Sequence, residues 1–233
     1  MGLLNSGVDV RNVLYLYLTL AFPFMMTVFH FRTLLKKRGD YRAFLLYFAV
    51  FFTAFMAVPI LVVLVAAPSP RDFLWFVGLT PGHFGAGLLF VAVGVPIALV
   101  VGFIGSRDPA MQAQYPFSKE ACADLKKFIR FETAYFCLYY LPWEFVFRGI
   151  LFFPLIPMVG VIPALALQTI ISTLYHFGHP PAEIFAALGA GVIFGLIAYA
   201  TGSIFYAAII HATVGIGNDV FLYIRRSRPA RSA

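Results

Sequence analysis

The chain has 233 residues, of which 61% are hydrophobic and only 12% are charged. Its mean hydropathy is +0.88. Soluble domains carry roughly twice that charged fraction, so these values exclude an ordinary soluble protein and indicate a polytopic membrane protein. The net charge of +7 is not gathered into a basic patch with interleaved aromatic residues, so we expect no nucleic-acid partner.

Seven apolar stretches each approach the roughly 20 residues that a helix needs to cross a bilayer. We therefore predict an all-α, polytopic membrane protein of about seven transmembrane helices, with the site on the last four. Pro142 lies inside the fourth span, where a proline is expected to kink the helix. A simple hairpin between the fourth and fifth spans places their turn at about 154–158. The predicted spans are 11–31, 42–66, 84–105, 126–153, 158–177, 182–201 and 203–224.

The basic residues predict the orientation in the membrane. With seven spans, fourteen of the 17 Lys and Arg residues fall on one side. The positive-inside rule then predicts a plasma-membrane (inner-membrane) protein with its N-terminus outside and its C-terminus in the cytoplasm. These residues are Arg32, Lys36, Lys37, Arg38 and Arg42 in the first loop, Arg107, Lys119, Lys126, Lys127 and Arg130 around the third, and Arg225, Arg226, Arg228 and Arg231 after the last span.

The chain divides by the position of its buried ionisable residues. The first three spans hold no interior acid and no histidine except His30 at one end. The four later spans hold every buried ionisable residue. We therefore expect residues 1–110 to form a supporting three-helix half and 111–233 to carry the reactive helices. Gly191 and Gly195, four residues apart in the sixth span, are typical of close helix packing.

Glu144 and Arg148 lie within the fourth span, and His176 and His211 within later ones. Ionised side chains in hydrocarbon cost several kcal/mol, roughly, and usually mark a functional site. Residues four apart share a helical face, so Arg148 is expected to pair with Glu144. Two readings follow: a buried ion pair that only locks helices together, or a site in which Glu144 is a general base.

These motifs resemble those of the CPBP intramembrane proteases, which include the CAAX prenyl endopeptidases and bacteriocin-processing proteins. The family pattern is Glu-Glu-x-x-x-Arg, then a histidine after an aromatic-rich helix, then His-x-x-x-Asn. Glu144-Phe-Val-Phe-Arg148-Gly149 is similar to the first motif, Leu174-Tyr175-His176 to the second and Ile210-His211-Ala212 to the third. The resemblance covers about residues 110–225.

Two positions depart from the family pattern. Trp143 stands where the first Glu is usual, and Gly215 stands where the Asn is usual. A branch of the family with Trp-Glu-Phe-Phe-Phe-Arg-Gly, His-Phe-Gly and an acid eight residues after the last histidine is closer to this chain, which has Asp219 at that place. Asn218 and Asp219 then replace the Asn on one helical face, Asp219 is expected to hold His211 in one tautomer, and Gly215→Asn is expected to be tolerated.

The resemblance implies an intramembrane endopeptidase of the glutamic type. In this reading Glu144 and His176 activate a water, Arg148 fixes the Glu144 carboxylate, and His211 with Asn218 or Asp219 stabilises the oxyanion. We expect Trp143, Phe147 and His179 to contact the substrate, a membrane-anchored protein or peptide tail in the lipid bilayer. No cofactor is expected; two histidines and a carboxylate are a conceivable zinc set, but the sequence has no HExxH spacing and the family reaction is thought to need no metal.

Two alternatives stay open. Trp143 and Gly215 are compatible with an inactive relative that binds membrane-anchored tails without cutting them. The same polar residues are compatible with a transporter or channel that conducts protons or ions. The sequence sets neither the substrate, nor the cleavage position, nor the oligomeric state.

Overall fold

The computed structural model describes residues 9–27 and 40–227, which form helices and no strands. His30, four of the first-loop basic residues, Arg228 and Arg231 lie outside these ranges. The helices are α1 (Val10–Thr27), α3 (Asp40–Phe52), η1 (Thr53–Ala57), α4 (Val58–Ala66), α5 (Pro70–Phe76), α6 (Phe84–Gly105), α7 (Pro109–Gln114), η2 (Glu120–Ala123), α8 (Leu125–Tyr135), η3 (Phe136–Tyr140), α9 (Leu141–Glu144), η4 (Phe145–Phe152), α10 (Phe153–Val159), α11 (Val161–Leu174), α12 (Pro181–Thr201) and α13 (Phe205–Ser227).

The predicted fold class is confirmed: the protein is an all-α, multi-pass membrane protein. Five of its described helices are long and apolar enough to cross a bilayer, namely 40–66, 84–105, 125–159, 181–201 and 205–226. The fifth predicted span is a shorter apolar helix, α11, of 14 residues. The first, α1, has 18 residues and carries Arg11 and Asn12 in its first turn. The count of seven stays a prediction.

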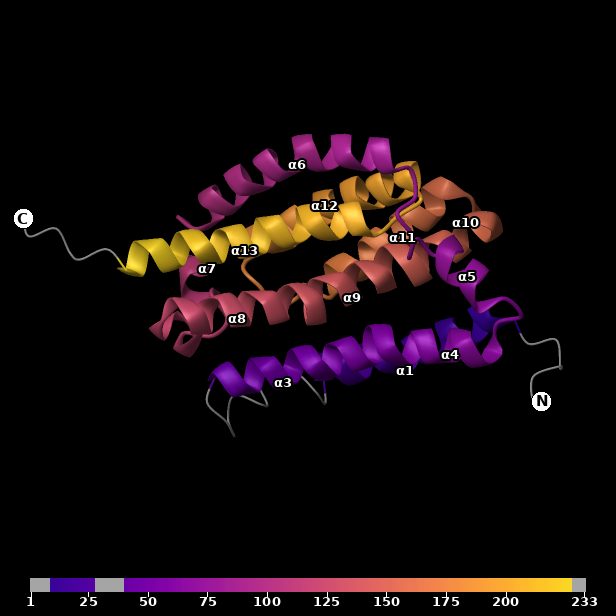
Figure 1. The fold of residues 1–233 in the computed structure, drawn as a ribbon, viewed down its shortest axis with the longest axis horizontal. Helices are drawn as coiled ribbons and strands as arrows, with labels where there is room; N and C mark the ends of the chain where they lie inside the picture. The colour runs from indigo at the N-terminus through magenta and orange to yellow at the C-terminus, as the bar shows by residue number, and fades with distance from the viewer. Residues whose placement is uncertain (1–8, 28–39, 228–233) are drawn as a thin grey trace, which may run out of the picture.

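The long helix α8–α10 runs through the middle of the molecule (Figure 1). On one side lie α1 and the continuous helix α3–α4; on the other lie α13 and, beyond it, α6, with α11 and α12 filling the remaining side. Helix α8 begins after Asp124, whose carboxylate accepts a hydrogen bond from the Lys127 N–H at 2.8 Å, as an N-cap does. The third predicted span, α6, packs on α13 rather than on α1 and α3. The division into halves at residue 110 stays a prediction.

The turn between the fourth and fifth spans differs from the sequence prediction. It lies at Gly160, between α10 and α11, rather than at 154–158. Pro154 and Pro157 both lie inside α10, while Gly160 has a φ of +88°, a conformation that glycine adopts without steric cost. Because residues 144 and 176 are each sixteen positions from this turn, an antiparallel hairpin brings Glu144 and His176 to the same depth.

Glycines set how closely the later helices approach one another. A Cβ atom on Gly191 would lie 2.8 Å from the Thr169 side chain, and one on Gly195 would lie 2.4 Å from Leu165. Both contacts are with α11, so the small-residue face predicted for the sixth span is confirmed. A Cβ on Gly102 would lie 2.8 Å from the Val214 carbonyl oxygen. Helix α13, which carries His211, is thereby held directly against α6.

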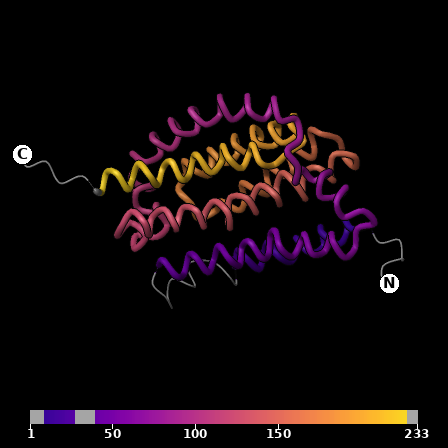
Figure 2. Tube along the Cα trace, viewed as in Figure 1, coloured from indigo at the N-terminus to yellow at the C-terminus, as the bar shows by residue number. Residues whose placement is uncertain are grey.

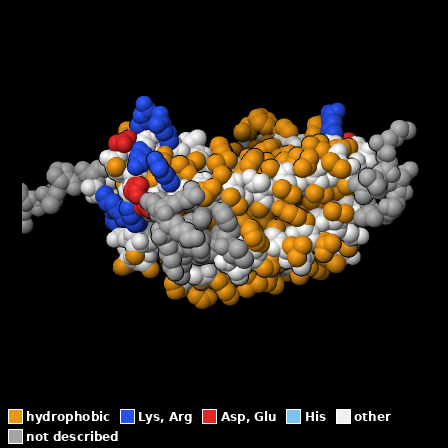
Figure 3. Space-filling view, turned by 90° about the horizontal axis from the view of Figure 1, so that it is seen from below, with side chains coloured by type: hydrophobic (Ala, Val, Ile, Leu, Met, Phe, Trp, Pro, Cys, Tyr) orange, Lys and Arg blue, Asp and Glu red, His pale blue; other side chains and the backbone are white. Residues whose placement is uncertain are grey.

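Basic side chains gather at one end of the molecule. Figure 3 shows most of the visible Lys and Arg side chains at that end, a further group at the opposite end, and a long apolar surface between the two. The described basic residues of the first and third loops and of the last helix belong to elements that meet at this end in Figure 1. Arg225 also donates to the Ser106 carbonyl at 2.8 Å, which ties the end of α13 to the end of α6. The described chain begins near one end of the molecule and finishes near the other (Figure 2); the odd number of crossings stays a prediction.

The charge distribution leads to a prediction about topology. A reporter fused after the C-terminus should read cytoplasmic, and one inserted at Ser69, before α5, should read external, because the basic end stays on the cytoplasmic side. Paired fusions to alkaline phosphatase and a fluorescent protein measure both positions. A cytoplasmic signal at Ser69 would contradict this orientation.

Candidate functional site

Wide, π-helical turns lie on both sides of the turn that ends in Glu144, and the second of them carries Arg148. Segments η3 and η4 have this form, with the ordinary helical turn α9 between them. The Leu141 N–H bonds to the carbonyl of Phe136, five residues back, so Pro142, which has no N–H, follows a turn that is already widened. The chain stays helical through Pro142 to Val159. All eight residues of η4 are buried, so this stretch faces protein on every side.

Glu144 and Arg148 form the ion pair that their spacing predicts. Arg148 Nε lies 3.2 Å from Glu144 Oε2, and the two side chains are 2% and 0% exposed. The atoms are close but not aligned for a hydrogen bond, so Nε, Nη1 and Oε2 have no hydrogen-bond partner. Arg148 Cζ also lies 5.6 Å from the centroid of the Phe194 ring, whose face attracts a cation. The attraction between Glu144 and Arg148 is therefore chiefly one between opposite charges.

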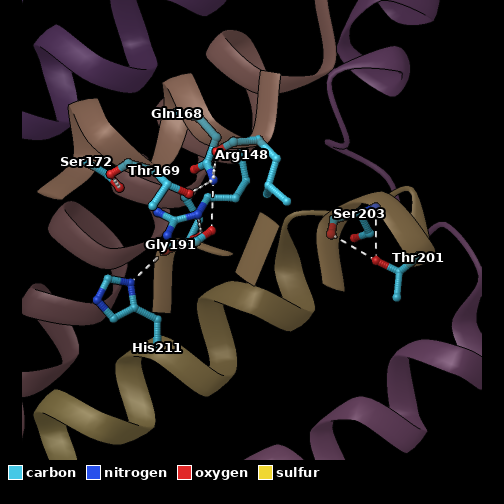
Figure 4. A network of polar contacts seen from close by, with 10 residues as sticks. Arg148, Gln168, Thr169, Ser172, Gly191, Thr201, Ser203 and His211 are labelled. Carbon is cyan, nitrogen blue, oxygen red and sulfur yellow. Dashed lines mark hydrogen bonds and ion pairs between the residues drawn. The ribbon is translucent and has the colours of Figure 1, made fainter. Parts of the chain in front are cut away.

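His211 binds the other oxygen of Glu144. Its Nδ1 lies 2.6 Å from Glu144 Oε1, and Figure 4 shows its ring on α13 turned toward Arg148. An ionised carboxylate can only accept a hydrogen bond, so Nδ1 donates and a neutral His211 keeps Nε2 as a free acceptor. The carboxylate thus fixes the tautomer of an imidazole that lies 67 residues away in the sequence.

His176, like His211, packs against Trp143. The indole centroid is 4.9 Å from that of His176 and 6.2 Å from that of His211, edge-to-face in both cases. His176 Nδ1 donates to the Ser172 carbonyl at 2.8 Å, so its Nε2 is also the free acceptor in the neutral ring. Trp143 therefore contacts two imidazoles of the same tautomer. Among the described residues, no three His, Cys, Asp or Glu side chains gather as metal ligands would.

The expected contact between Asp219 and His211 is wrong. Asp219 Oδ1 accepts from Asn218 Nδ2 at 3.0 Å, and its Oδ2 has no hydrogen-bond partner. Eight residues along a helix separate Asp219 from His211 by about 12 Å, and Glu144 already occupies the nitrogen in question. Asn218 lies toward α6, where its Oδ1 would be 3.4 Å from a Cβ on Gly105. The structure thus keeps both residues away from the imidazole.

Asp219 belongs instead to a buried region near the basic end. Asp219 is fully buried. Glu132, a second buried acid, is 6% exposed, and neither of its carboxylate oxygens has a hydrogen-bond partner. Lys119 lies nearby, outside the spans. Burial and the charge of Arg226 lower the pKa of Lys119 to about 8, whereas the negative charge of Asp219 acts to raise it. The sequence interpretation missed Glu132, although an acid in the fourth span was signal enough.

The expected tolerance of Gly215→Asn is also wrong. A Cβ atom at position 215 would lie 1.7 Å from the Tyr140 hydroxyl. Tyr140 is 5% exposed and is packed against Tyr135, so it has little room to move. The space beside Gly215 on this face of α13 is filled by Tyr140 of η3, a residue that belongs to none of the sequence motifs.

The three residues expected to contact substrate lie in different surroundings. Trp143 and Phe147 are 2% and 1% exposed, and Phe147 stacks on Phe22 of α1 at 5.4 Å. His179 Nδ1 lies 3.0 Å from both Glu183 Oε1 and the Tyr115 hydroxyl. It also lines a small pocket whose other walls are aromatic residues and methionines of α1, α3, η3 and the segments that follow α7 and α11. Of the three, His179 alone borders an opening.

Comparison with known proteins supports the family resemblance. Residues 132–216 match the family model described as type II CAAX prenyl endopeptidase Rce1-like. The matched segment includes Glu144, Arg148, His176 and His211, and it ends before Asn218. The resemblance to the CPBP/CAAX proteases is thereby confirmed. Comparisons with curated proteins and with solved structures give no match.

The buried ion pair leads to a prediction about stability. Glu144→Ala should destabilise the protein by about 3–5 kcal/mol, because it leaves Arg148 buried without its counter-charge. Glu144→Gln keeps the shape and an acceptor oxygen and should cost less. Thermal unfolding of detergent-solubilised protein measures both. The double variant Glu144→Ala, Arg148→Leu is the control and should recover part of the loss; a Glu144→Ala protein as stable as wild type would contradict the pairing.

Proposed function

We propose that the chain, whose residues 132–216 match the type II CAAX prenyl endopeptidase Rce1-like family model, is an intramembrane endopeptidase that hydrolyses a peptide bond in a membrane-anchored protein or peptide. Family membership supports this class of protease in general. The observation that carries the finer proposal is the contact between the buried Glu144 carboxylate and His211 Nδ1, at 2.6 Å.

Glu144 and His211 act together as the base in this proposal. Both Glu144 oxygens are engaged, one by His211 and one by the charge of Arg148, and the side chain is fully buried. His211 is 18% exposed at its side chain, and its Nε2 is the free acceptor. The proton of the attacking water therefore goes to Nε2, while Glu144 holds the ring and stabilises the imidazolium, as a carboxylate does in a hydrolase triad.

The remaining residues complete the hydrolysis. Nε2 of His176 accepts a hydrogen bond from the same water and orients its oxygen toward the substrate carbonyl. Attack forms a tetrahedral intermediate, and the proton held on His211 passes to the departing amine as the carbon–nitrogen bond breaks. The charge of Arg148 holds Glu144 Oε2 in place. Asn218 and Asp219 have no part in this reaction, because their contacts lie elsewhere.

The substrate reaches this site from the bilayer. Trp143 packs against both imidazoles, and His179, whose ring centroid lies 5.7 Å from that of His176, borders a pocket lined by aromatic residues and methionines. An extended, membrane-anchored tail with its scissile bond near the depth of His176 and His211 is the class of substrate that fits. Cleavage needs no nucleophilic Ser or Cys.

The proposal predicts that Glu144→Gln and His211→Gln each lower cleavage at least ~10²-fold. Each removes one half of the same base, so the double variant should be no slower than either single variant. Purified full-length protein in nanodiscs, assayed on a panel of fluorogenic membrane-anchored peptides, measures the three rates.

The matched control is Glu132→Gln, which removes another buried carboxylate from the same long helix but lies outside the proposed site. It should cleave at close to the wild-type rate. Equal losses in Glu132→Gln and Glu144→Gln would indicate that both act through folding. Absence of cleavage by wild type across the panel, or full activity in Glu144→Gln, would reject the proposed function.

A further inference from the structure

We infer that Tyr140 is a positioning residue for His211, and that Gly215 supplies the notch in which Tyr140 is seated. The catalytic meaning of this inference rests on the proposed function, since His211 is part of the base there. The arrangement itself rests on contacts of Tyr140 with His211 and with Gly215. These link η3, which precedes Glu144 on the long helix, to α13.

The Tyr140 ring packs directly on the imidazole. The two ring centroids are 4.9 Å apart and the rings are inclined by 74°, the edge-to-face geometry that aromatic pairs favour. Phe194 lies 5.2 Å from His211 and Trp143 at 6.2 Å. His211 thus contacts three aromatic rings, and these contacts together with the bond from Nδ1 to Glu144 restrict the orientation of the imidazole. Tyr140 comes closest of the three.

The hydroxyl end of Tyr140 fits against the backbone of the helix that carries His211. A Cβ at position 215 would be 1.7 Å from the hydroxyl oxygen and 2.8 Å from Cζ. Gly215 lies one helical turn beyond His211, so the ring bridges the imidazole and the notch on one face of α13. Tyr135 and Tyr139 close the other sides, with centroids at 4.5 Å and 5.9 Å from Tyr140.

A substitution at Gly215 should therefore act through the tyrosine. Any side chain there displaces Tyr140, and Tyr140 cannot retreat without disturbing its neighbours or rotating against His211. The residue at position 215 then controls the orientation of His211 without touching the substrate. In a site where about 1 Å of displacement can cost 10²-fold in rate, this control matters to catalysis.

The same helix offers a matched control. Tyr206, also on α13, lies against Gly87 of α6, where a Cβ would be 2.1 Å from its Cζ. Its hydroxyl donates to the Pro81 carbonyl at 2.7 Å. This second tyrosine–glycine contact joins two helices as tightly as the first. The described ring contacts of His211 do not include Tyr206, so it separates an effect on packing from an effect on the imidazole.

The first experiment does not depend on cleavage. Protein labelled with ¹⁵N in its histidine rings is studied by NMR in detergent micelles, with His211→Gln used to assign the His211 signals. Wild type should show His211 protonated at Nδ1 in a strong hydrogen bond. Tyr140→Leu and Gly215→Ala should both alter those signals, whereas Tyr206→Leu and Gly87→Ala should leave them unchanged. His211 signals in Tyr140→Leu and Gly215→Ala identical to wild type would overturn the inference.

The second experiment measures cleavage of the membrane-anchored peptides. Tyr140→Leu should lower kcat at least ~10-fold with little change in KM, because the imidazole is misplaced while substrate contacts remain. Tyr140→Phe keeps the ring and should lose no more than about fivefold, the equivalent of one ordinary hydrogen bond. The double variant Tyr140→Leu, Gly215→Ala should be no slower than either single variant, since both act through the same ring.

The two experiments distinguish the inference from the proposed function. Altered His211 signals in a protein that cleaves nothing would support the arrangement and reject the protease. Cleavage by wild type with full kcat in Tyr140→Leu would support the protease and reject the positioning role. Losses in Tyr140→Leu and Gly215→Ala that multiply in the double variant would also reject it.

Discussion

The buried carboxylate of Glu144 is the constraint on which the rest of the structure depends. An ionised group that is removed from water needs compensating charge or hydrogen bonds. Arg148 supplies the charge from the same helix, and His211 supplies the hydrogen bond from α13. Because Arg148 is close to Glu144 in the sequence and His211 is far from it, α13 must pack beside α9 with His211 at the depth of Glu144. The glycine contacts between α13 and α6 support that placement.

The tryptophan at position 143 changes the chemistry available to the site. The site has a single carboxylate, in contact with His211, rather than two acids that repel each other. The indole instead packs edge-to-face with both His176 and His211. It also joins a cluster of aromatic residues that reaches Phe22 of α1 through Phe147. The N-terminal helices thus support the wall of the site by apolar packing.

Small residues have two different effects in this fold. Gly191 and Gly195 let α12 lie close to α11, which is a general effect on helix spacing. Gly215 instead receives one particular side chain, that of Tyr140. A glycine of the second kind cannot be recognised from helical spacing, because the residue that fills its notch lies on another helix, 75 positions earlier in the chain.

The sequence by itself determined the fold class, the membrane class, the position of most helices and the pair Glu144–Arg148. These follow from hydropathy and helical period, which act over a few residues. Tertiary structure decided that the turn lies at Gly160, that Glu144 rather than Asp219 holds His211, and that Tyr140 occupies the notch at Gly215. Each depends on which helix faces which, and that is set by the packing of whole surfaces rather than by any local pattern.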